Sequence, residues 1–245
     1  MMTGKRLLDE LVDDLNALEL PYMASKLEFL YHSPEFLTMD HMTLLTELIT
    51  GEYDESRSRK LSSHLKNAGL QGCCEEINNC NDTTTRKYSP SGVVEQLSSL
   101  EFIRLGYNIC ILGASDSGKT YLAKALAISA CHDYTVKYFH SEALVETMVD
   151  LKAIDFKKYT SKMRKICNTD LVVLDDFLLH TITDEREVKV LFELLERRAE
   201  KNKSTIICSQ RDPANWTSMI LNDEISANSI IKRAVRHYTV YITKK

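Results

Sequence analysis

Residues 113–120 read GASDSGKT, which places two glycines, a lysine and a threonine at the spacing G-x-x-x-x-G-K-[ST]. Loops of this pattern wrap nucleotide phosphates with inward-pointing backbone N–H groups at the start of a helix. An apolar run of strand length, 107–112, precedes the loop, and 121–131 is rich in Ala and Leu without Gly or Pro. The motif requires this order of strand, loop and helix. The sequence therefore predicts a nucleotide-binding protein.

The residues of this phosphate loop, 113–120, and the residue after it are expected to surround the phosphates of ATP. They are Gly113, Ala114, Ser115, Asp116, Ser117, Gly118, Lys119, Thr120 and Tyr121. Gly113 and Gly118 permit backbone angles that other residues avoid. The Lys119 ammonium is expected to bond the β- and γ-phosphate oxygens, and the Thr120 hydroxyl to bind Mg²⁺. ATP and Mg²⁺ are the expected cofactors.

A second part of the site is predicted at 171–176, where four apolar residues are followed by Asp175 and Asp176. This pattern is typical of a buried parallel strand that ends at the edge where nucleotides bind. We expect Asp175 to hold Mg²⁺ through water and Asp176 to polarise the attacking water. A core strand followed by a helix-capping Asp is the alternative reading. Gln210 follows another apolar run, 204–208, and either reaches the γ-phosphate or belongs to a surface loop.

The N-terminal part, residues 1–85, is expected to be a small all-helical domain. Leucines recur at helical spacing within 5–30, a run that Pro21 interrupts, and a further helix is plausible over 41–67. Residues 78–85 are polar and short-chained, as in a linker, so the domain boundary is expected near residue 85. This domain is expected to serve contacts with a partner protein, with DNA or with other copies of the chain.

The C-terminal part, residues 86–245, alternates strand and helix patterns. Such alternation predicts an α/β fold with helices on both faces of a five-stranded parallel sheet. The strands are expected at 107–112, 134–140, 171–175, 204–208 and 238–242.

Composition limits the location and the partners. No apolar run approaches the ~20 residues that cross a membrane, and the N-terminus lacks the apolar core of a signal peptide, so a cytoplasmic protein without membrane contact is expected. Seven cysteines, an odd number, are expected to be reduced thiols. A net charge of −4 argues against a surface that binds nucleic acid throughout, so any such contact must be local.

Three clusters of basic residues are candidates for local contacts. The first has no acid between Asp155 and Asp170, and non-specific binding to the DNA backbone is expected of it; it consists of Lys157, Lys158, Lys162, Arg164 and Lys165. The second is the segment 225–245, with five Lys or Arg and no acid. The third, in the N-terminal part, contains Arg57, Arg59 and Lys60. A solvated helix face is the alternative for the first and third clusters, and an intrachain surface Arg is the alternative for Arg233 in the second.

Five segments in this order resemble the IstB-like ATPases, AAA+ helpers of insertion-sequence transposases that are related to bacterial replicative-helicase loaders. They are GASDSGKT, LVVLDD, LFELLERR, STIICSQ and NWTSMILNDEISANSIIKR, and the N-terminal LLDELVDDLNALELPYMASKLEFL resembles the same family. The resemblance implies an AAA+ P-loop fold, ATP hydrolysis, a transposase partner, duplex DNA and a homo-oligomeric ring or filament. By position, Gln210 matches the family's first sensor. Arg233 matches its arginine finger, which serves a neighbouring subunit.

The sequence departs from the family at three places. The family more often has Gly or Thr where Asp116 and Ser117 stand in the phosphate loop. Asp176 stands where many AAA+ ATPases carry Glu, and the shorter side chain predicts slow hydrolysis. The family's second sensor Arg has no counterpart before residue 245. A helicase loader, a monomeric P-loop kinase and a non-hydrolysing scaffold remain alternative functions.

Overall fold

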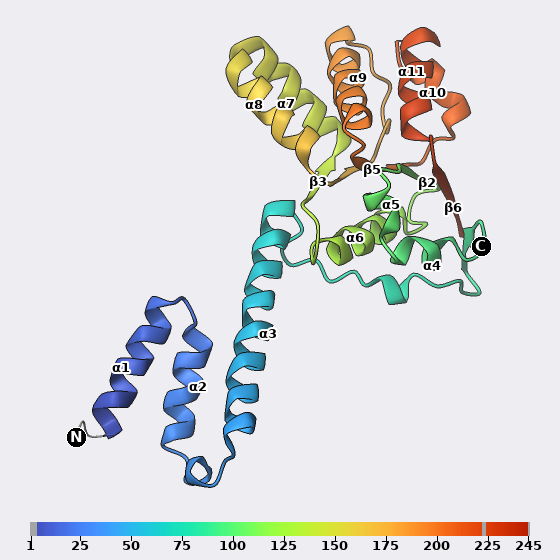
Figure 1. Cartoon of the computed structure of the whole chain (residues 1–245). Helices are drawn as coiled ribbons and strands as arrows, with labels where there is room; N and C mark the ends of the chain where they lie inside the picture. Colours follow the sequence, from blue (N-terminus) through green and yellow to red (C-terminus); the bar gives the residue numbers. More distant parts are fainter. Residues whose placement is uncertain (1–3, 222–223, 245) are drawn as a thin grey trace. The chain divides into compact units, whose positions relative to one another are not determined.

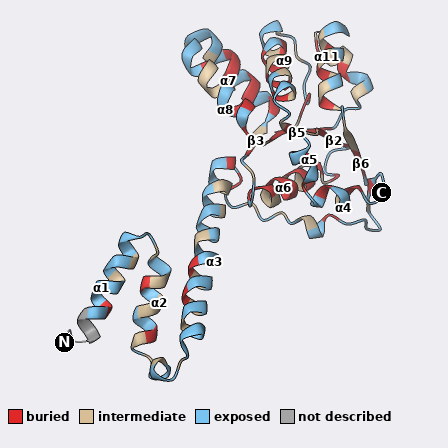
Figure 2. Ribbon diagram, viewed as in Figure 1, coloured by how far each residue is buried: buried red, intermediate tan, exposed pale blue. Residues whose placement is uncertain are grey.

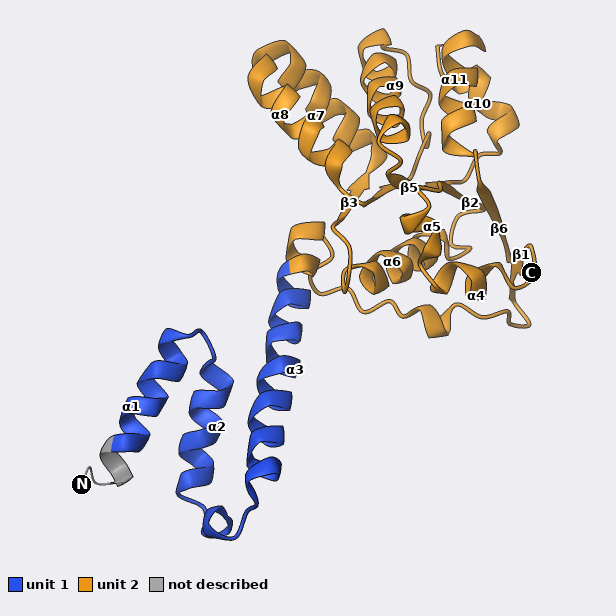
Figure 3. Cartoon of the chain, in the orientation of Figure 1, with its two compact units in different colours: residues 1–63 blue, residues 64–245 orange. Residues whose placement is uncertain are grey.

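The computed structural model describes residues 4–221 and 224–244. The chain divides into two compact units, which meet in sequence between Ser63 and His64 (Figure 3). This division lies N-terminal to the boundary expected near residue 85, because the segment between them packs with the second unit. Within that unit, His64 Nδ1 lies 2.8 Å from the Cys131 carbonyl oxygen, and Glu75 pairs with Lys124.

The N-terminal unit is helical, as predicted. Its elements are α1 (Gly4–Ala17), α2 (Pro21–Tyr31), the 3₁₀ helix η1 (Pro34–Leu37) and the larger part of α3 (His41–Ala68). Pro21 opens α2, where its missing N–H costs no helical hydrogen bond. The small core of this unit consists of Leu8, Ala24, Leu30 and Leu48 (Figure 2).

Arg59, from the basic cluster of the N-terminal part, has a partner within this unit. Its guanidinium pairs with Glu52 at 2.7 Å, and Glu52 also accepts a 3.0 Å hydrogen bond from the Met23 N–H. Although burial acts to raise the pKa of Glu52, these two partners hold that pKa below its usual value. Arg59 therefore helps to hold α3 against α2.

The second unit contains one six-stranded sheet in the order β1-β6-β2-β5-β4-β3. Its strands are β1 (Arg86–Ser89), β2 (Ile109–Gly113), β3 (Val136–His140), β4 (Leu171–Asp175), β5 (Ser204–Ser209) and β6 (Tyr238–Lys244). The five predicted strands are confirmed and are mutually parallel. The sheet has one strand more than predicted, because the four-residue β1 adds antiparallel to β6 at the edge.

Helices cover both faces of the sheet, as Figure 1 shows for α7 to α11 on one side and α4 to α6 on the other. They are α4 (Val93–Ser98), α5 (Glu101–Arg104), α6 (Lys119–Ala130), α7 (Ser141–Ile154), α8 (Phe156–Asn168), α9 (Glu185–Glu200), α10 (Trp216–Met219) and α11 (Glu224–Ala234). Two short 3₁₀ helices, η2 (Ile77–Asn79) and η3 (Pro213–Asn215), complete the unit. The strands β2, β4 and β5 are buried from end to end apart from Gly113, as expected for parallel strands covered on both faces.

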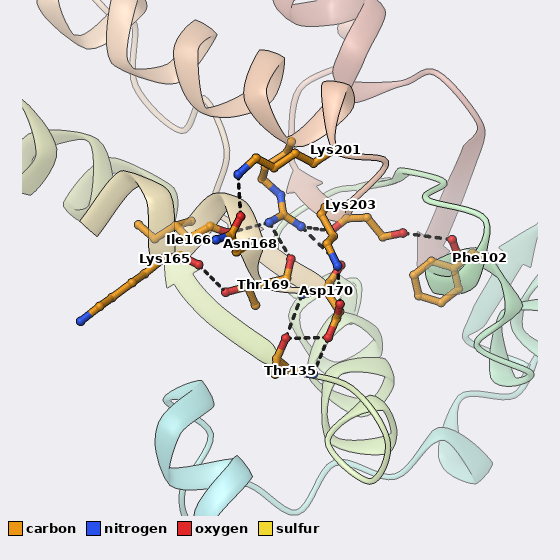
Figure 4. Close-up of polar contacts among 11 residues, drawn as sticks. Phe102, Thr135, Lys165, Ile166, Asn168, Thr169, Asp170, Lys201 and Lys203 are labelled. Atoms are coloured by element: carbon orange, nitrogen blue, oxygen red, sulfur yellow. Dashed lines mark hydrogen bonds and ion pairs between the residues drawn. The ribbon is translucent and has the colours of Figure 1, made fainter. Parts of the chain in front are cut away.

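A buried arginine joins β4, β5 and α9 at the amino-terminal edge of the parallel strands. Arg198 is 1% exposed, and its side chain donates to the Thr205 hydroxyl and to the carbonyls of Ile166, Thr169, Asp170 and Ser204. Figure 4 shows the polar contacts at this edge, where Asp170 also contacts Thr135 and Lys203. Burial lowers the pKa of Arg198 to about 10, so the group stays charged at neutral pH. These contacts fix the strands whose opposite ends carry the candidate site.

Two further findings concern the whole described chain. No helix in residues 4–221 and 224–244 has both the length and the apolar character needed to cross a membrane. The seven cysteines, all within the described residues, form no disulfide with one another, and five of them are buried.

Candidate nucleotide-binding site

The phosphate loop connects β2 to α6, as predicted, and its two glycines are required for different reasons. Gly118 has φ of +103°, a conformation that residues with a Cβ rarely adopt. Gly113 was expected to need unusual backbone angles as well, but its φ is not positive. A Cβ on Gly113 would lie 2.5 Å from the Ile242 carbonyl oxygen and 2.6 Å from Ser117 Oγ, so close packing excludes a side chain there. Asp116 also has a positive φ, +59°, which Asp tolerates better than most residues.

The start of α6 offers hydrogen-bond donors that the protein does not use. The first helical bond runs from the Leu122 N–H to the Gly118 carbonyl at 3.0 Å. Consequently, the N–H groups of Lys119, Thr120 and Tyr121 have no backbone acceptor among the described residues. The Ser117 hydroxyl is fully buried and also lacks a partner within the described chain. Unused donors at a helix N-terminus fit an anionic ligand such as a chain of phosphates.

Lys119 carries its ammonium into this loop. The side chain is buried, with a relative exposure of 6% for the residue, and Nζ donates a 2.6 Å hydrogen bond to the Ala114 carbonyl within the loop. Burial lowers the pKa of Lys119, while the nearby Asp175 and Asp176 act in the opposite direction. A buried ammonium without an ion pair among the described residues is suited to a phosphate oxygen.

Asp175 ends β4, two strands away from the phosphate-loop strand β2 in the sheet order. It is 1% exposed, and its Oδ2 accepts a 2.5 Å hydrogen bond from the Tyr138 hydroxyl. Burial, and next the hydrogen bond to Asp175, raise the pKa of Tyr138, so the phenol keeps its proton. A carboxylate oriented in this way, together with the Thr120 hydroxyl, offers the oxygen ligands that Mg²⁺ prefers.

Asp176 is more exposed than its neighbour and has a positive φ of +53°. Its Oδ2 lies 3.5 Å from Nδ1 of His140, the last residue of β3. Ligand atoms of His140, Asp175 and Asp176 all lie within 4.8 Å of one another. The arrangement separates a buried carboxylate from an accessible one, which suits the two different roles expected of a metal ligand and a group that polarises water.

Gln210 follows β5, which lies between β2 and β4 in the sheet. Because Gln210 follows the C-terminal end of β5, it lies at the same edge as the phosphate loop and Asp175, where it is exposed. The preceding Ser209 is buried and donates a 2.8 Å hydrogen bond to the Phe177 carbonyl. This bond ties the end of β5 to the segment that follows Asp176.

Arg233 lies on α11, and its described contacts are within its own chain. It pairs with Glu196 of α9, donates a 2.7 Å hydrogen bond to the Ser229 carbonyl, and lies 5.0 Å from the centroid of the Phe192 ring. Its side chain retains 25% exposure. The structure therefore places Arg233 in contact with α9 rather than with the phosphate loop, and its service to a neighbouring subunit stays a prediction.

The predicted basic cluster lies on α8, with four of its five residues exposed and Lys162 partly buried. Two of them, Lys157 and Arg164, line a groove beside α9, to which Arg197 and Glu200 of α9 and the following Lys201 also contribute. Of the five, only Lys158 has an acidic partner among the described residues, Asp155 at 3.2 Å. Arg197 pairs with Glu193 at 2.7 Å and Glu200 also lines the groove, so the positive charge without an acidic partner lies mainly on α8.

Sequence reasoning missed two residues of this site, Tyr138 and His140. Both lie in the predicted strand 134–140 and alternate onto one face, with their rings in an edge-to-face contact. Their proximity to the aspartates depends on β3 pairing with β4, in which His140 is opposite Asp175. The alternation was visible in the sequence, but the strand order was not.

Comparison with known proteins supports the resemblance to one family. Residues 13–245 match the family described as IstB-like ATP binding protein. The ATP-binding protein of insertion sequence IS21 from Pseudomonas aeruginosa is 26% identical over 228 residues, which cover 92% of this chain and 83% of that protein. The insertion-sequence ATP-binding protein y4uH from Sinorhizobium fredii is 28% identical over 226 residues, with coverages of 91% and 88%.

Solved structures show the same fold. The DnaC helicase loader aligns with a TM-score of 0.54 at 18% identity, over 69% of this chain and 97% of that one. The replication initiator DnaA bound to AMPPCP and single-stranded DNA aligns with a TM-score of 0.55 at 20% identity. That alignment spans 69% of this chain and about half, 49%, of the DnaA chain. Together, the AAA+ fold, the phosphate loop and the match over residues 13–245 show that this chain belongs to the IstB-like ATP-binding protein family.

Proposed function

We propose that this protein binds ATP with Mg²⁺, hydrolyses ATP slowly, and helps a transposase by assembling as an oligomer on duplex DNA in the cytoplasm. The observation that carries the ATPase proposal is the sheet edge where β2, β4 and β5 end. The unused amide donors and the buried Lys119 ammonium follow the end of β2. Asp175 and Asp176 lie at the end of β4, and β5 runs between these two strands. Family membership supports the same reading.

The chemistry follows from the position of each group. The N–H groups at the start of α6 and the Lys119 ammonium bind the phosphate oxygens and balance their charge. Thr120 and Asp175 would hold Mg²⁺, which when bound neutralises charge that develops on the phosphates. Asp176 is exposed enough to accept a hydrogen bond from the attacking water. Because Asp is one methylene shorter than Glu, its reach is reduced and slow turnover follows.

The DNA and partner proposals rest on different observations. The exposed lysines and the exposed Arg164 on α8 form a surface that fits the phosphates of a DNA backbone. The relatives are ATP-binding proteins of insertion sequences, which supports a transposase as the partner. Arg233 lies on α11 next to α9, and an assembly would use it across a subunit interface.

Two substitutions test the ATPase proposal. Lys119→Ala is expected to remove most ATP affinity, because phosphate charge then faces uncompensated backbone dipoles. Asp176→Asn is expected to keep ATP affinity and slow hydrolysis, because the amide retains the size but loses the basicity of the carboxylate. Binding is measured by titration calorimetry, and hydrolysis by single-turnover assays with and without duplex DNA.

Lys189→Ala provides the control, because Lys189 is exposed on α9 and pairs with the exposed Glu185 at 3.0 Å. It is expected to bind ATP as the parent does. Unchanged ATP binding in Lys119→Ala contradicts the assignment of the loop. If Asp176→Asn lowers affinity and hydrolysis together, Asp176 holds the metal or the fold instead of polarising water.

A further inference from the structure

Arg86, the first residue of the edge strand β1, lies directly against the phosphate loop. A Cβ placed on Gly118 would come within 2.9 Å of Arg86 Cζ and 3.1 Å of its Nε. The guanidinium therefore packs on the last loop residue before α6, beside the N–H groups that have no acceptor. Arg86 itself is partly buried.

The backbone around Arg86 is held in place by hydrogen bonds. The Arg86 N–H donates to Thr83 Oγ1 at 3.0 Å, its carbonyl accepts from the Thr83 N–H at 2.8 Å, and the Tyr88 N–H donates to Asp82 Oδ1 at 2.8 Å. Arg86 and Tyr88 share one face of β1, because side chains alternate along a strand. Burial raises the pKa of the Tyr88 hydroxyl, and the nearby Arg86 guanidinium opposes that rise. The side chain is thus directed toward the loop by a fixed strand and a buried neighbour.

Arg86 differs from three other arginines in its charge partners. The exposed Arg59 pairs with Glu52 and the exposed Arg197 with Glu193, and Arg233, which is partly buried like Arg86, pairs with Glu196. Among the described residues, no carboxylate forms an ion pair with Arg86. A cation that is partly removed from water and packed on an anion-binding loop is suited to a ligand phosphate.

The order of the strands indicates which phosphates Arg86 faces. β5 and β4, which carry Gln210 and Asp175, lie on one side of β2, whereas β6 and β1 lie on the other. The γ-phosphate must face the carboxylates and the attacking water. The α- and β-phosphates then lie toward β1, on the side from which Arg86 approaches.

We infer that Arg86 is a nucleotide-binding residue whose guanidinium contacts the α- or β-phosphate of bound ATP and ADP. This inference rests on the proposed ATP binding and adds a second cation to the site beside Lys119. Because both nucleotides carry these two phosphates, Arg86 contributes equally to the binding of ATP and of ADP. The contact also joins the nucleotide to the segment that precedes β1.

The test compares Arg86→Ala with Lys87→Ala in the full chain. Lys87 is the adjacent residue of β1, exposed on the opposite face, so its removal changes the net charge equally without touching the loop. Dissociation constants for ATP, ADP and inorganic tripolyphosphate are measured by titration calorimetry. In Arg86→Ala, all three are expected to weaken by roughly tenfold, which corresponds to about 1.4 kcal/mol. Lys87→Ala is expected to stay within about twofold of the parent.

Three results overturn the inference. Parent-like affinities in Arg86→Ala, while Lys119→Ala loses ATP, exclude a phosphate contact by Arg86 and leave the proposed function standing. If Arg86→Ala binds ATP more weakly but binds ADP as the parent does, the contact is with the γ-phosphate. If both nucleotides bind more weakly but the affinity for tripolyphosphate is unchanged, the contact is with the base or the ribose.

Thermal melting without nucleotide checks the fold, and Arg86→Gln replaces Arg86→Ala if the latter does not fold. Absence of ATP binding in the parent contradicts the proposed function itself.

Discussion

The hydroxyl of Tyr138 donates a 2.5 Å hydrogen bond to Oδ2 of Asp175, which joins β3 to β4 at the edge where ATP is proposed to bind. Burial and the aspartate both raise the pKa of Tyr138, so its hydroxyl stays protonated far above neutral pH. As a permanent donor, it holds one carboxylate oxygen and leaves Oδ1 to accept from the Asp176 N–H at 3.1 Å. The orientation of the proposed Mg²⁺ ligand thus depends on a residue of the neighbouring strand.

Tyr138→Phe is expected to raise the Mg²⁺ concentration for half-maximal ATP hydrolysis by about tenfold, the usual effect of removing a group that orients a metal ligand. ATP affinity without Mg²⁺ should change little, because the phosphate donors remain. Magnesium titrations of single-turnover hydrolysis measure the effect, with Tyr134→Phe as the control for loss of a phenol elsewhere in the segment. Equal magnesium requirements in Tyr138→Phe and the parent contradict the positioning role.

Asp170, at the opposite edge of the sheet, is expected to make stability depend on pH. Burial acts to raise its pKa, but hydrogen bonds from Lys203 at 2.6 Å and from the Thr135 hydroxyl at 2.6 Å outweigh it, so the pKa lies below the ordinary 3.8. The folded state therefore binds a proton less readily than the unfolded state. This contribution to stability is present above about pH 4 and is lost as the pH falls through the lower folded pKa.

Asp170→Asn should consequently be less stable than the parent at pH 7, by about 1 kcal/mol given the partial exposure of the pair. The difference should shrink as the pH falls from about 5 to 2. Urea unfolding at a series of pH values measures it, with the exposed Asp133→Asn as control. A stability difference that stays constant over this range shows that the charge of Asp170 is not responsible.

Much of this site could be predicted because its signals are local. The phosphate loop and the segment 171–176 each consist of consecutive residues. The residue types within each segment are enough to predict its backbone conformation and the edge of the sheet at which it lies. By contrast, β1 reads Arg-Lys-Tyr-Ser and has no clear strand pattern, so it forms only by pairing with β6, more than 140 positions away. The need for glycine at 113 likewise arises from the Ile242 carbonyl, which the local sequence does not reveal.

The residues missed at the site share this dependence on distant pairing. Tyr138 and His140 lie beside the aspartates because β3 and β4 are neighbours. Arg86 contacts Gly118 because β1 pairs with β6 at the edge of the sheet.

The sequence predicted the helices of the first unit but not its end, since α3 continues past Ser63 and the polar segment after it packs on α6. Hydrophobic periodicity locates elements but not their neighbours.

The basic face of α8 is expected to bind duplex DNA without reading its sequence. Replacing Lys157, Lys158 and Lys162 together by Ala should weaken binding about equally for unrelated duplexes. It should also reduce the slope of log affinity against log salt by about 2 to 3, because fewer counterions are released. Fluorescence anisotropy over a range of salt concentrations measures both quantities.

A variant that lacks the exposed Lys87, Arg104 and Lys189 instead provides the control for loss of three positive charges. It should retain the parent's salt dependence. Coincident salt slopes for the parent and the α8 variant exclude α8 as the DNA surface.

Arg233 is expected to complete the active site of an adjacent subunit, although Glu196 and Phe192 hold it within the isolated chain. An arginine supplied across an interface contributes roughly 10³ to 10⁵ in hydrolysis rate by stabilising charge on the transferred phosphoryl group. Arg233→Ala should therefore bind ATP with near-parent affinity and hydrolyse it poorly. Arg236→Ala, which removes an exposed arginine of the same segment, should retain hydrolysis.

Mixing two inactive variants tests whether Arg233 acts between subunits. When Arg233→Ala is combined with Lys119→Ala, some interfaces contain an intact phosphate loop on one side and an intact Arg233 on the other. Those interfaces should restore part of the hydrolysis, measured after size-exclusion chromatography has shown that the two variants assemble together. If co-assembled mixtures stay inactive, Arg233 serves its own chain through the ion pair with Glu196, and the loss of hydrolysis in Arg233→Ala reflects a displaced α11 instead of a missing partner residue.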